Sequence, residues 1–166
     1  MNVLIKYLLM FVSLVLIQVL ILNQIQLGGF INPYIYILFV ILLPLSAPRY
    51  AVMLLGFVLG LTIDVFMNSL GIHAAATVFI AYLRPLVIRS ISSHEEDRNE
   101  YPGLHQNKFK WFLSYTAIMV VLHHLVLFYI EVFTFTDFFK TLYHVFLSAL
   151  FSVFIIVLSQ FLIFRR

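Results

Sequence analysis

The run GFVLGLTIDVFMNSLGIHAAATVFIAYLRP, from Gly56 to Pro85, joins two apolar segments through a short polar turn. Each segment is long enough for a membrane-crossing helix, since about 20 apolar residues span about 30 Å of hydrocarbon. The run therefore predicts a helical hairpin. Asp64, His73 and Arg84 lie inside it, although an ionisable side chain is costly to place in lipid. The use of these three residues is the central question that the sequence raises.

The composition is that of an integral membrane protein. Of the 166 residues, 63% are hydrophobic, 17% are aromatic and only 10% are charged, whereas soluble domains carry about 25% charged residues. No polar stretch is long enough to bury a core of its own, so residues 1–166 are expected to form a single membrane domain. The absence of cysteine excludes disulfides, thiolate catalysis and cysteine-ligated metals.

The hydropathy pattern predicts an all-α membrane protein with six transmembrane helices in one bundle. The first segment is interpreted as a retained helix, because its apolar run is long for a signal peptide and no small-residue cleavage site follows it. The second segment is short and tyrosine-rich, and if it were re-entrant the orientation of everything after it would be inverted. The expected helices are about 3–22, 32–45, 49–67, 71–89, 110–130 and 138–164, with a cytoplasmic loop at 90–109.

The distribution of basic residues predicts the orientation. If the amino terminus is cytoplasmic, every Lys and Arg except Lys140 lies at or near the inner side, and cytoplasmic loops are the ones that accumulate these residues. Both termini are therefore expected inside. The loop at 90–109 carries the acids Glu95, Glu96, Asp97 and Glu100, which are interpreted as a solvated linker, with contact to a basic partner as the alternative.

The glycine spacing in the opening run predicts tight helix packing. Gly56, Gly60 and Asp64 are four residues apart and share one helix face, and small residues at this spacing let another helix approach closely. Asp64 and His73 both fall near the outer end of the hairpin. A contact between Asp64 and His73, or solvation of Asp64, is therefore expected, and an ion pair between Asp64 and Arg84 is not. For Asp64 a structural or capping role is preferred to partner contact or ligand binding.

Arg84 and Pro85 fall at the other end of the hairpin. Arg84 lies about 20 Å along the helix from Gly71 at 1.5 Å per residue, so its side chain is expected to extend toward the inner headgroups. Pro85 removes a backbone hydrogen bond and predicts a kink.

The remaining polar residues do not form a recognisable catalytic or metal motif. His123 and His124 are adjacent and point in different directions, and His144 is on the last helix, so hydrogen bonds between helices are preferred to a metal site. No nucleophile motif or phosphate-binding glycine loop is present. We therefore expect a protein that is not an enzyme and has no cofactor, no metal and no nucleic-acid partner.

The ordered polar and glycine positions of the opening run resemble the MreD family of rod shape-determining proteins. In that family a glycine-spaced helix ends in an acid and apolar residues, followed by a turn, Leu-Gly, a histidine and alanine. The matching positions are Gly56, Gly60, Asp64, Val65, Phe66, Leu70, Gly71, His73 and Ala74, with Tyr82, Leu83, Arg84 and Pro85 closing the run.

The resemblance implies a small scaffold protein of the bacterial inner membrane, within the cell-wall elongation machinery (the elongasome). It implies a partner similar to MreC, which has a single span and a periplasmic domain, and through it a link between peptidoglycan synthesis and the cytoskeleton. It also implies a fold similar to the substrate-binding subunits of energy-coupling-factor importers. The alternative function is a solute-binding subunit of such an importer, and the short uncharged outer loops favour the scaffold. Whether the chain forms a homodimer stays open.

Overall fold

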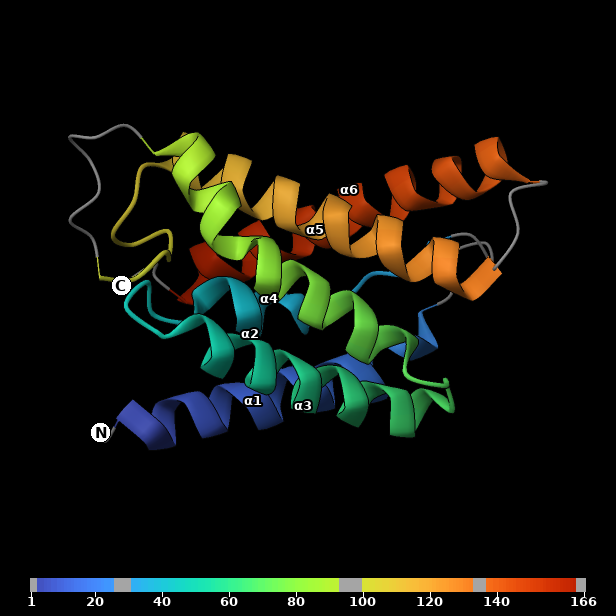
Figure 1. Cartoon of the computed structure of the whole chain (residues 1–166), viewed down its shortest axis with the longest axis horizontal. Helices are drawn as coiled ribbons and strands as arrows, with labels where there is room; N and C mark the ends of the chain where they lie inside the picture. Colours follow the sequence, from blue (N-terminus) through green and yellow to red (C-terminus); the bar gives the residue numbers. More distant parts are fainter. Residues whose placement is uncertain (1–2, 26–30, 93–99, 133–136, 164–166) are drawn as a thin grey trace.

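The computed structural model describes residues 3–25, 31–92, 100–132 and 137–163, and its regular elements there are helices (Figure 1). In chain order these are α1 (Val3–Leu20), the short 3-10 helix η1 (Leu22–Gln24), α2 (Ile37–Leu42), α3 (Arg49–Met67), α4 (Ile72–Ile91), α5 (Phe109–Val132) and α6 (Phe138–Ile163).

Five segments of the described chain are long and apolar enough to cross a membrane, which confirms the expected helical membrane character. They are Val3–Gln24, Arg49–Met67, Ile72–Ile91, Phe109–Val132 and Phe138–Ile163. The second predicted helix, at 32–45, is wrong as a continuous helix, because only Ile37–Leu42 is helical. Pro33 and Pro44 flank it, and the residue before a proline is sterically disfavoured in the helical conformation. The two prolines therefore leave room for a short helix only.

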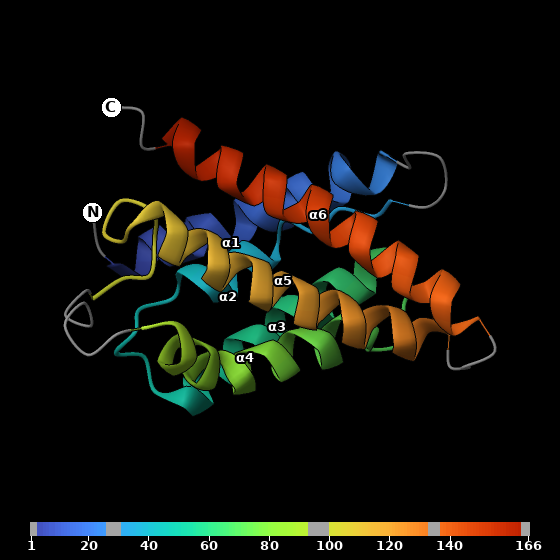
Figure 2. The same cartoon turned by 90° about the horizontal axis from the view of Figure 1, so that it is seen from above.

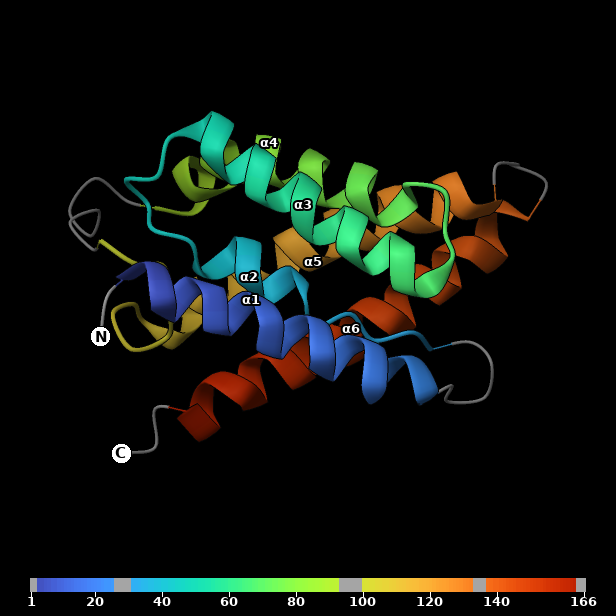
Figure 3. The same cartoon turned by 90° about the horizontal axis from the view of Figure 1, so that it is seen from below.

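The long helices surround the short one. Along the chain α3 packs on α4, α4 on α5 and α5 on α6, whereas α1 packs on α3, and α2 contacts α1, α3, α4 and α5. Figures 2 and 3 show α2 enclosed by the longer helices from two opposite sides. The two chain ends lie toward the same end of the bundle (Figure 1).

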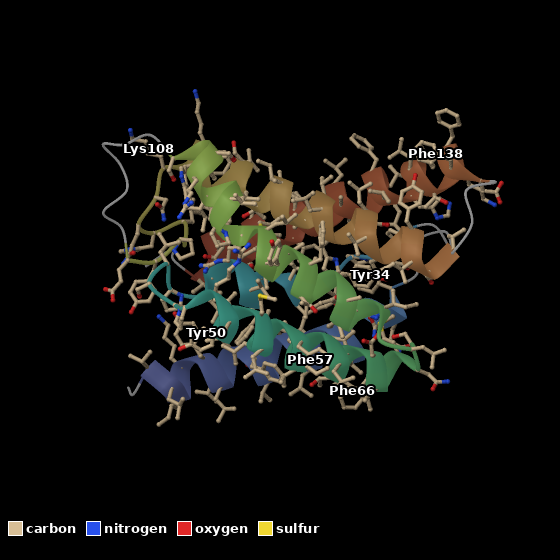
Figure 4. The ribbon with its side chains drawn as sticks, in the orientation of Figure 1. Tyr34, Tyr50, Phe57, Phe66, Lys108 and Phe138 are labelled. Carbon is tan, nitrogen blue, oxygen red and sulfur yellow. The ribbon has the colours of Figure 1, made fainter. Side chains whose placement is uncertain are left out.

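The second segment, residues 32–45, forms the centre of the core. Tyr36, Ile37, Val40 and Ile41 have no exposed surface, and every residue from Tyr34 to Ile41 is buried. By contrast, large apolar side chains cover the outside of the long helices; on α3, Phe57 and Phe66 point away from the bundle, while Tyr34 lies inside it (Figure 4). An apolar outer surface is what a bilayer-embedded bundle presents to lipid.

The second segment runs from one end of the bundle to the other, although it is mostly not helical. Asn32 and Ser69, from the turn between α3 and α4, line the same cavity at one end. Leu45, at the end of the segment, lines another cavity together with Arg89 from the last turn of α4. This cavity is therefore at the opposite end of α4 from the first one. With the five long helices, this segment makes a sixth crossing of the bundle, which is why the termini lie at the same end.

Helix α4 continues through Pro85 to Ile91. Its last turns leave the direction of its first turns in Figures 1 and 2, as the proline predicts.

Candidate functional site

Extended backbone in the interior of a membrane protein needs hydrogen-bond partners from the protein, because lipid offers none. The first half of the second segment obtains them from two neighbouring helices. The N–H of Ile35 donates to Oε1 of Gln18 (2.9 Å), and Nε2 of Gln18 donates to the carbonyl of Pro33 (3.0 Å). Gln18 comes from α1 and is fully buried. One glutamine therefore satisfies both a donor and an acceptor of the extended chain.

Two serines of α6 complete this half. The N–H groups of Asn32 and Tyr34 donate to the hydroxyls of Ser148 (3.1 Å) and Ser152 (2.9 Å), respectively. The serines are four residues apart, so both face the segment from one side of α6. These partners were not foreseen from the sequence. The signal that could have found them is the four-residue spacing of two serines in an otherwise apolar helix.

Arg84 and Tyr115 serve the other end of the segment, where α2 ends and its last carbonyls have no partner within the helix. Arg84 donates to the carbonyls of Leu43 and Pro44 (3.2 Å for Pro44) and, through Nε, to the Tyr115 hydroxyl (2.9 Å). Tyr115 donates in turn to the carbonyl of Ile41 (3.3 Å). The expectation that Arg84 extends to the headgroups is wrong, because its guanidinium is buried among these acceptors.

Asp64 joins the two helices of the hairpin. Its Oδ1 accepts from the backbone N–H of His73 (3.0 Å) and the Ser69 hydroxyl (2.6 Å), and its Oδ2 accepts from the N–H of Ala74 (2.9 Å). Nδ1 of His73 lies 3.0 Å from Oδ1, as expected for the Asp64–His73 contact. A carboxylate that receives the first N–H groups of a helix acts as its amino-terminal cap. Asp64 therefore caps α4 from the end of α3.

The turn between α3 and α4 depends on two left-handed residues. Asn68 ends α3 with φ 55°, and Gly71 precedes α4 with φ 84°. Glycine adopts this conformation without a steric penalty, and asparagine tolerates it better than most residues. The turn brings Ser69 and His73 back onto the Asp64 carboxylate.

The glycine face of α3 lies against α4. A Cβ atom at Gly60 would come within 2.3 Å of the Thr77 hydroxyl oxygen and 2.5 Å of the Ala74 Cα, so only glycine fits there without movement. At Gly56 the nearest atom would be the Thr77 carbonyl oxygen at 3.3 Å, which is tight but not a clash. Close contact at small residues replaces the hydrophobic drive that is absent in lipid.

The histidines of α5 also face the second segment. Nε2 of His123 lies 2.9 Å from the Tyr36 hydroxyl, and Nε2 of His124 lies 3.2 Å from the Ser152 hydroxyl. The contact of His124 joins α5 to α6, as the sequence favoured for this pair, whereas His123 meets Tyr36 just before α2 begins. Among the described residues, no three His, Cys, Asp or Glu side chains come together as a metal site would require.

Ser69, His73 and Asp64 do not have the geometry of a hydrolytic triad. In such a triad the acid and the serine contact different nitrogens of the histidine. Here Ser69 lies 3.0 Å from Nδ1 of His73, the same nitrogen that contacts Asp64. The cluster therefore ties the turn together rather than activating the serine.

A cavity of about 230 Å³ opens beside this turn. Polar groups from four parts of the chain line it, and Nε2 of His73, which is buried, has no hydrogen-bond partner among the described residues. The polar lining residues are Asn23, Asn32, Tyr34, Ser69, His73 and Glu131. The short uncharged outer loops therefore do not exclude a polar cavity at this end of the bundle, because residues distant in sequence supply its lining.

The site residues predicted from the sequence fall into two groups that do not meet. Asp64, Gly71 and His73 form the turn at one end, and Arg84 and Pro85 lie at the other end, beside the carbonyls that close α2. Gly56 and Gly60 lie along the helix contact between them. Over the residues that the structure describes, fold and site define a helical protein with five helices able to cross a membrane and a sixth crossing segment held by side chains. Comparison of the chain with protein-family models, curated proteins and solved structures found no match.

Proposed function

We propose that the chain is a non-catalytic scaffold of the bacterial cell-wall elongation complex, as its resemblance to the MreD family implies. In this role it binds a single-span partner similar to MreC in the inner membrane and links peptidoglycan synthesis to the cytoskeleton. One observation supports the proposal most. The residues that carry the resemblance form hydrogen bonds and close contacts inside the bundle, as in Asp64 capping α4 and Arg84 holding the end of α2.

A scaffold needs a stable shape and an outer surface that a partner helix can contact. The interior ties described above supply the first. The second is available on α1 and α6, whose large apolar side chains are exposed along the helix, among them Leu8 and Leu16 on α1 and Phe146 and Phe154 on α6. A partner's transmembrane helix would pack on such a surface in place of lipid.

The proposed orientation has both termini in the cytoplasm. Lys108 and Tyr50, which follows Arg49, lie toward the end of the bundle where the chain termini lie (Figures 1 and 4). Phe138 lies at the opposite end (Figure 4), and Lys140 follows it in the first turn of α6. Because basic residues accumulate on the cytoplasmic side, this asymmetry supports an inward-facing basic end.

The test is co-purification of the tagged chain from membranes of a rod-shaped bacterium that depends on it. We expect recovery of a single-span protein with a periplasmic domain, and rounding of the cells when the chain is depleted. An unrelated multi-span protein with the same tag is the control for non-specific recovery. Rods that stay unchanged after depletion, with no single-span partner recovered, would contradict the scaffold.

The second candidate is a solute-binding subunit of a small-molecule importer. The observation that favours it is the cavity of about 230 Å³ beside His73, with its polar lining. Recovery of a transporter ATPase module in the same co-purification would favour this function and count against the scaffold.

A further inference from the structure

A second cavity, of about 240 Å³, lies at the other end of the hairpin. It is bounded by the connection before α3, by the first turn of α3 and by the last turns of α4. Three arginines line it: Arg49 from α3, and Arg84 and Arg89 from α4. Arg84 is buried, whereas Arg49 and Arg89 are exposed, so the cavity has a buried cation inside and two exposed cations at its rim.

The charge of this cavity is not balanced by the residues that line it. Among the lining residues that the structure describes, which do not include 93–99, there is no Asp or Glu. Within the part of the chain that the structure describes, the contact found between an acid and a basic side chain is that of Asp64 with His73, at the other end of the hairpin. The partners of Arg84 are neutral, namely two carbonyls and a tyrosine hydroxyl. A buried cation without a counter-charge is costly, so an anion in the cavity would be favourable.

Arg84 inside the cavity and Arg49 at its rim each have N–H donors to spare. Nε (3.2 Å) and Nη2 (2.8 Å) of Arg49 donate to the carbonyl of Tyr82, and the guanidinium lies over the Tyr82 ring at 3.9 Å from the centroid. These contacts hold the guanidinium in place, and its other N–H groups have no partner among the described residues. Arg84 likewise has more N–H groups than its three bonds use. Arginines with fixed planes and unused N–H groups suit the oxygens of a phosphate.

The start of α3 adds a favourable dipole to the same place. Arg49 is the first residue of this 19-residue helix, and no side chain caps it. The amino end of a helix carries a partial positive charge and attracts anions.

The position of the cavity distinguishes a lipid from a soluble anion. Arg49 and Arg89 stand at the ends of two membrane-crossing helices, which is the depth of lipid headgroups. Tyr82 and Leu86, exposed on α4, continue from the rim as an apolar surface on which acyl chains can lie. A free phosphate would make no use of that surface.

We propose that the cavity between Arg49, Arg84 and Arg89 binds the phosphate of an anionic membrane lipid, with the acyl chains on the outer face of α4. This site is separate from the partner surface of the scaffold and does not depend on the proposed function.

The test measures stabilisation of the purified full chain in neutral detergent by added short-chain lipids. The variant R49Q/R89Q removes the two rim charges and keeps Arg84, which the fold needs. The control variant K108Q/K110Q loses the same charge at the same end of the bundle, outside this cavity. Dioctanoyl phosphatidylglycerol is compared with dioctanoyl phosphatidylcholine, whose headgroup has no net charge, and with glycerol 3-phosphate, which has no acyl chains.

We expect phosphatidylglycerol to raise the melting temperature of the wild type, and phosphatidylcholine and glycerol 3-phosphate to act only at much higher concentration. R49Q/R89Q should weaken the apparent lipid affinity about tenfold or more, and K108Q/K110Q about twofold or less. Equal lipid affinity in R49Q/R89Q and the wild type would overturn the proposal. So would equal effects of phosphatidylglycerol and glycerol 3-phosphate, which would indicate a soluble anion. If the chain bound lipid only after Glu95, Glu96 and Asp97 were changed to amides, these acids would be the counter-charges of the arginines in the wild type, and the proposal would be overturned.

Discussion

Nη1 of Arg84, on α4, donates to the carbonyl of Pro44 across 3.2 Å, forty residues back in the chain. This bond fixes the end of the second segment against α4, where that segment has no helix of its own to satisfy its carbonyls. It also gives a structural reason for a cation inside an apolar bundle.

Arg84→Met should therefore destabilise the fold strongly. The methionine keeps most of the apolar volume but makes none of the three hydrogen bonds, so the buried Leu43 carbonyl and the half-buried Pro44 carbonyl lose this donor. We expect a loss of about 3 kcal/mol or more, since each unsatisfied buried group costs about 1–3 kcal/mol. Thermal unfolding of the purified chain in detergent measures it. Lys110→Met, at an exposed position of the same end, should change the stability by about 0.5 kcal/mol or less; equal effects of the two changes would contradict the role of Arg84.

Gly60→Ala and Gly56→Ala form a matched pair on one helix face. At Gly60 the new methyl group would lie 2.5 Å from the Ala74 Cα and 2.6 Å from the His73 carbonyl oxygen, so the backbone of α4 must move. Overpacking of this kind costs about 1–3 kcal/mol. At Gly56 the closest approach is 3.3 Å and the cost should be clearly smaller. Denaturation of both variants in the same detergent gives the comparison, and a larger loss at Gly56 would show that the two helices pack differently.

Gln18→Leu should remove the tie between α1 and the extended segment. The change leaves the Ile35 N–H and the Pro33 carbonyl without their partner, for an expected loss of about 2 kcal/mol or more. Limited proteolysis and thermal unfolding should both report it. Gln24→Leu, at an exposed position just beyond α1, is the control and should leave stability nearly unchanged. If Gln18→Leu were as stable as that control, the segment would have another source of hydrogen bonds.

Asp64→Ala removes the cap of α4 and the partner of His73 in one step. Loss of a capping side chain costs about 0.5–2 kcal/mol, and the buried His73 loses its acceptor in addition. We expect reduced accumulation in membranes and, for the proposed scaffold, wider cells. Thr62→Ala is the control, because Thr62 bonds only the Val58 carbonyl of its own helix. Normal cell width with normal accumulation would exclude both a structural and a partner role for Asp64.

The sequence predicts the parts of the fold that depend on neighbouring residues. Long apolar runs predict five helices, and the polar turn around Asn68 and Gly71 predicts the hairpin. The positions of Asp64 and His73 near the outer end of that hairpin predict their contact. Each of these depends on residues within about ten positions of one another.

The contacts that sequence reasoning missed join residues far apart in the chain. The 32–45 run has the composition of a short helix, and only the neighbours that satisfy its backbone allow it to remain extended. Gln18 and Ser152 look like isolated polar residues in apolar helices until the segment is placed between them. Arg84 was expected to extend to the headgroups because the sequence does not show its acceptors. One of them, the Pro44 carbonyl, belongs to a residue forty positions earlier in the chain.

The crossing of the bundle by the second segment is tested most directly by the accessibility of single cysteines placed before and after it. The chain contains no cysteine, so Gln24→Cys and Ser46→Cys can be labelled without background. Both positions are exposed; Gln24 is the last residue of the crossing segment Val3–Gln24, and Ser46 lies in the connection before α3. With a membrane-impermeant maleimide, we expect Gln24→Cys to react in intact cells and Ser46→Cys to react only after the membrane is opened. Reaction of both positions from the same side would show that the segment does not cross and would contradict the account.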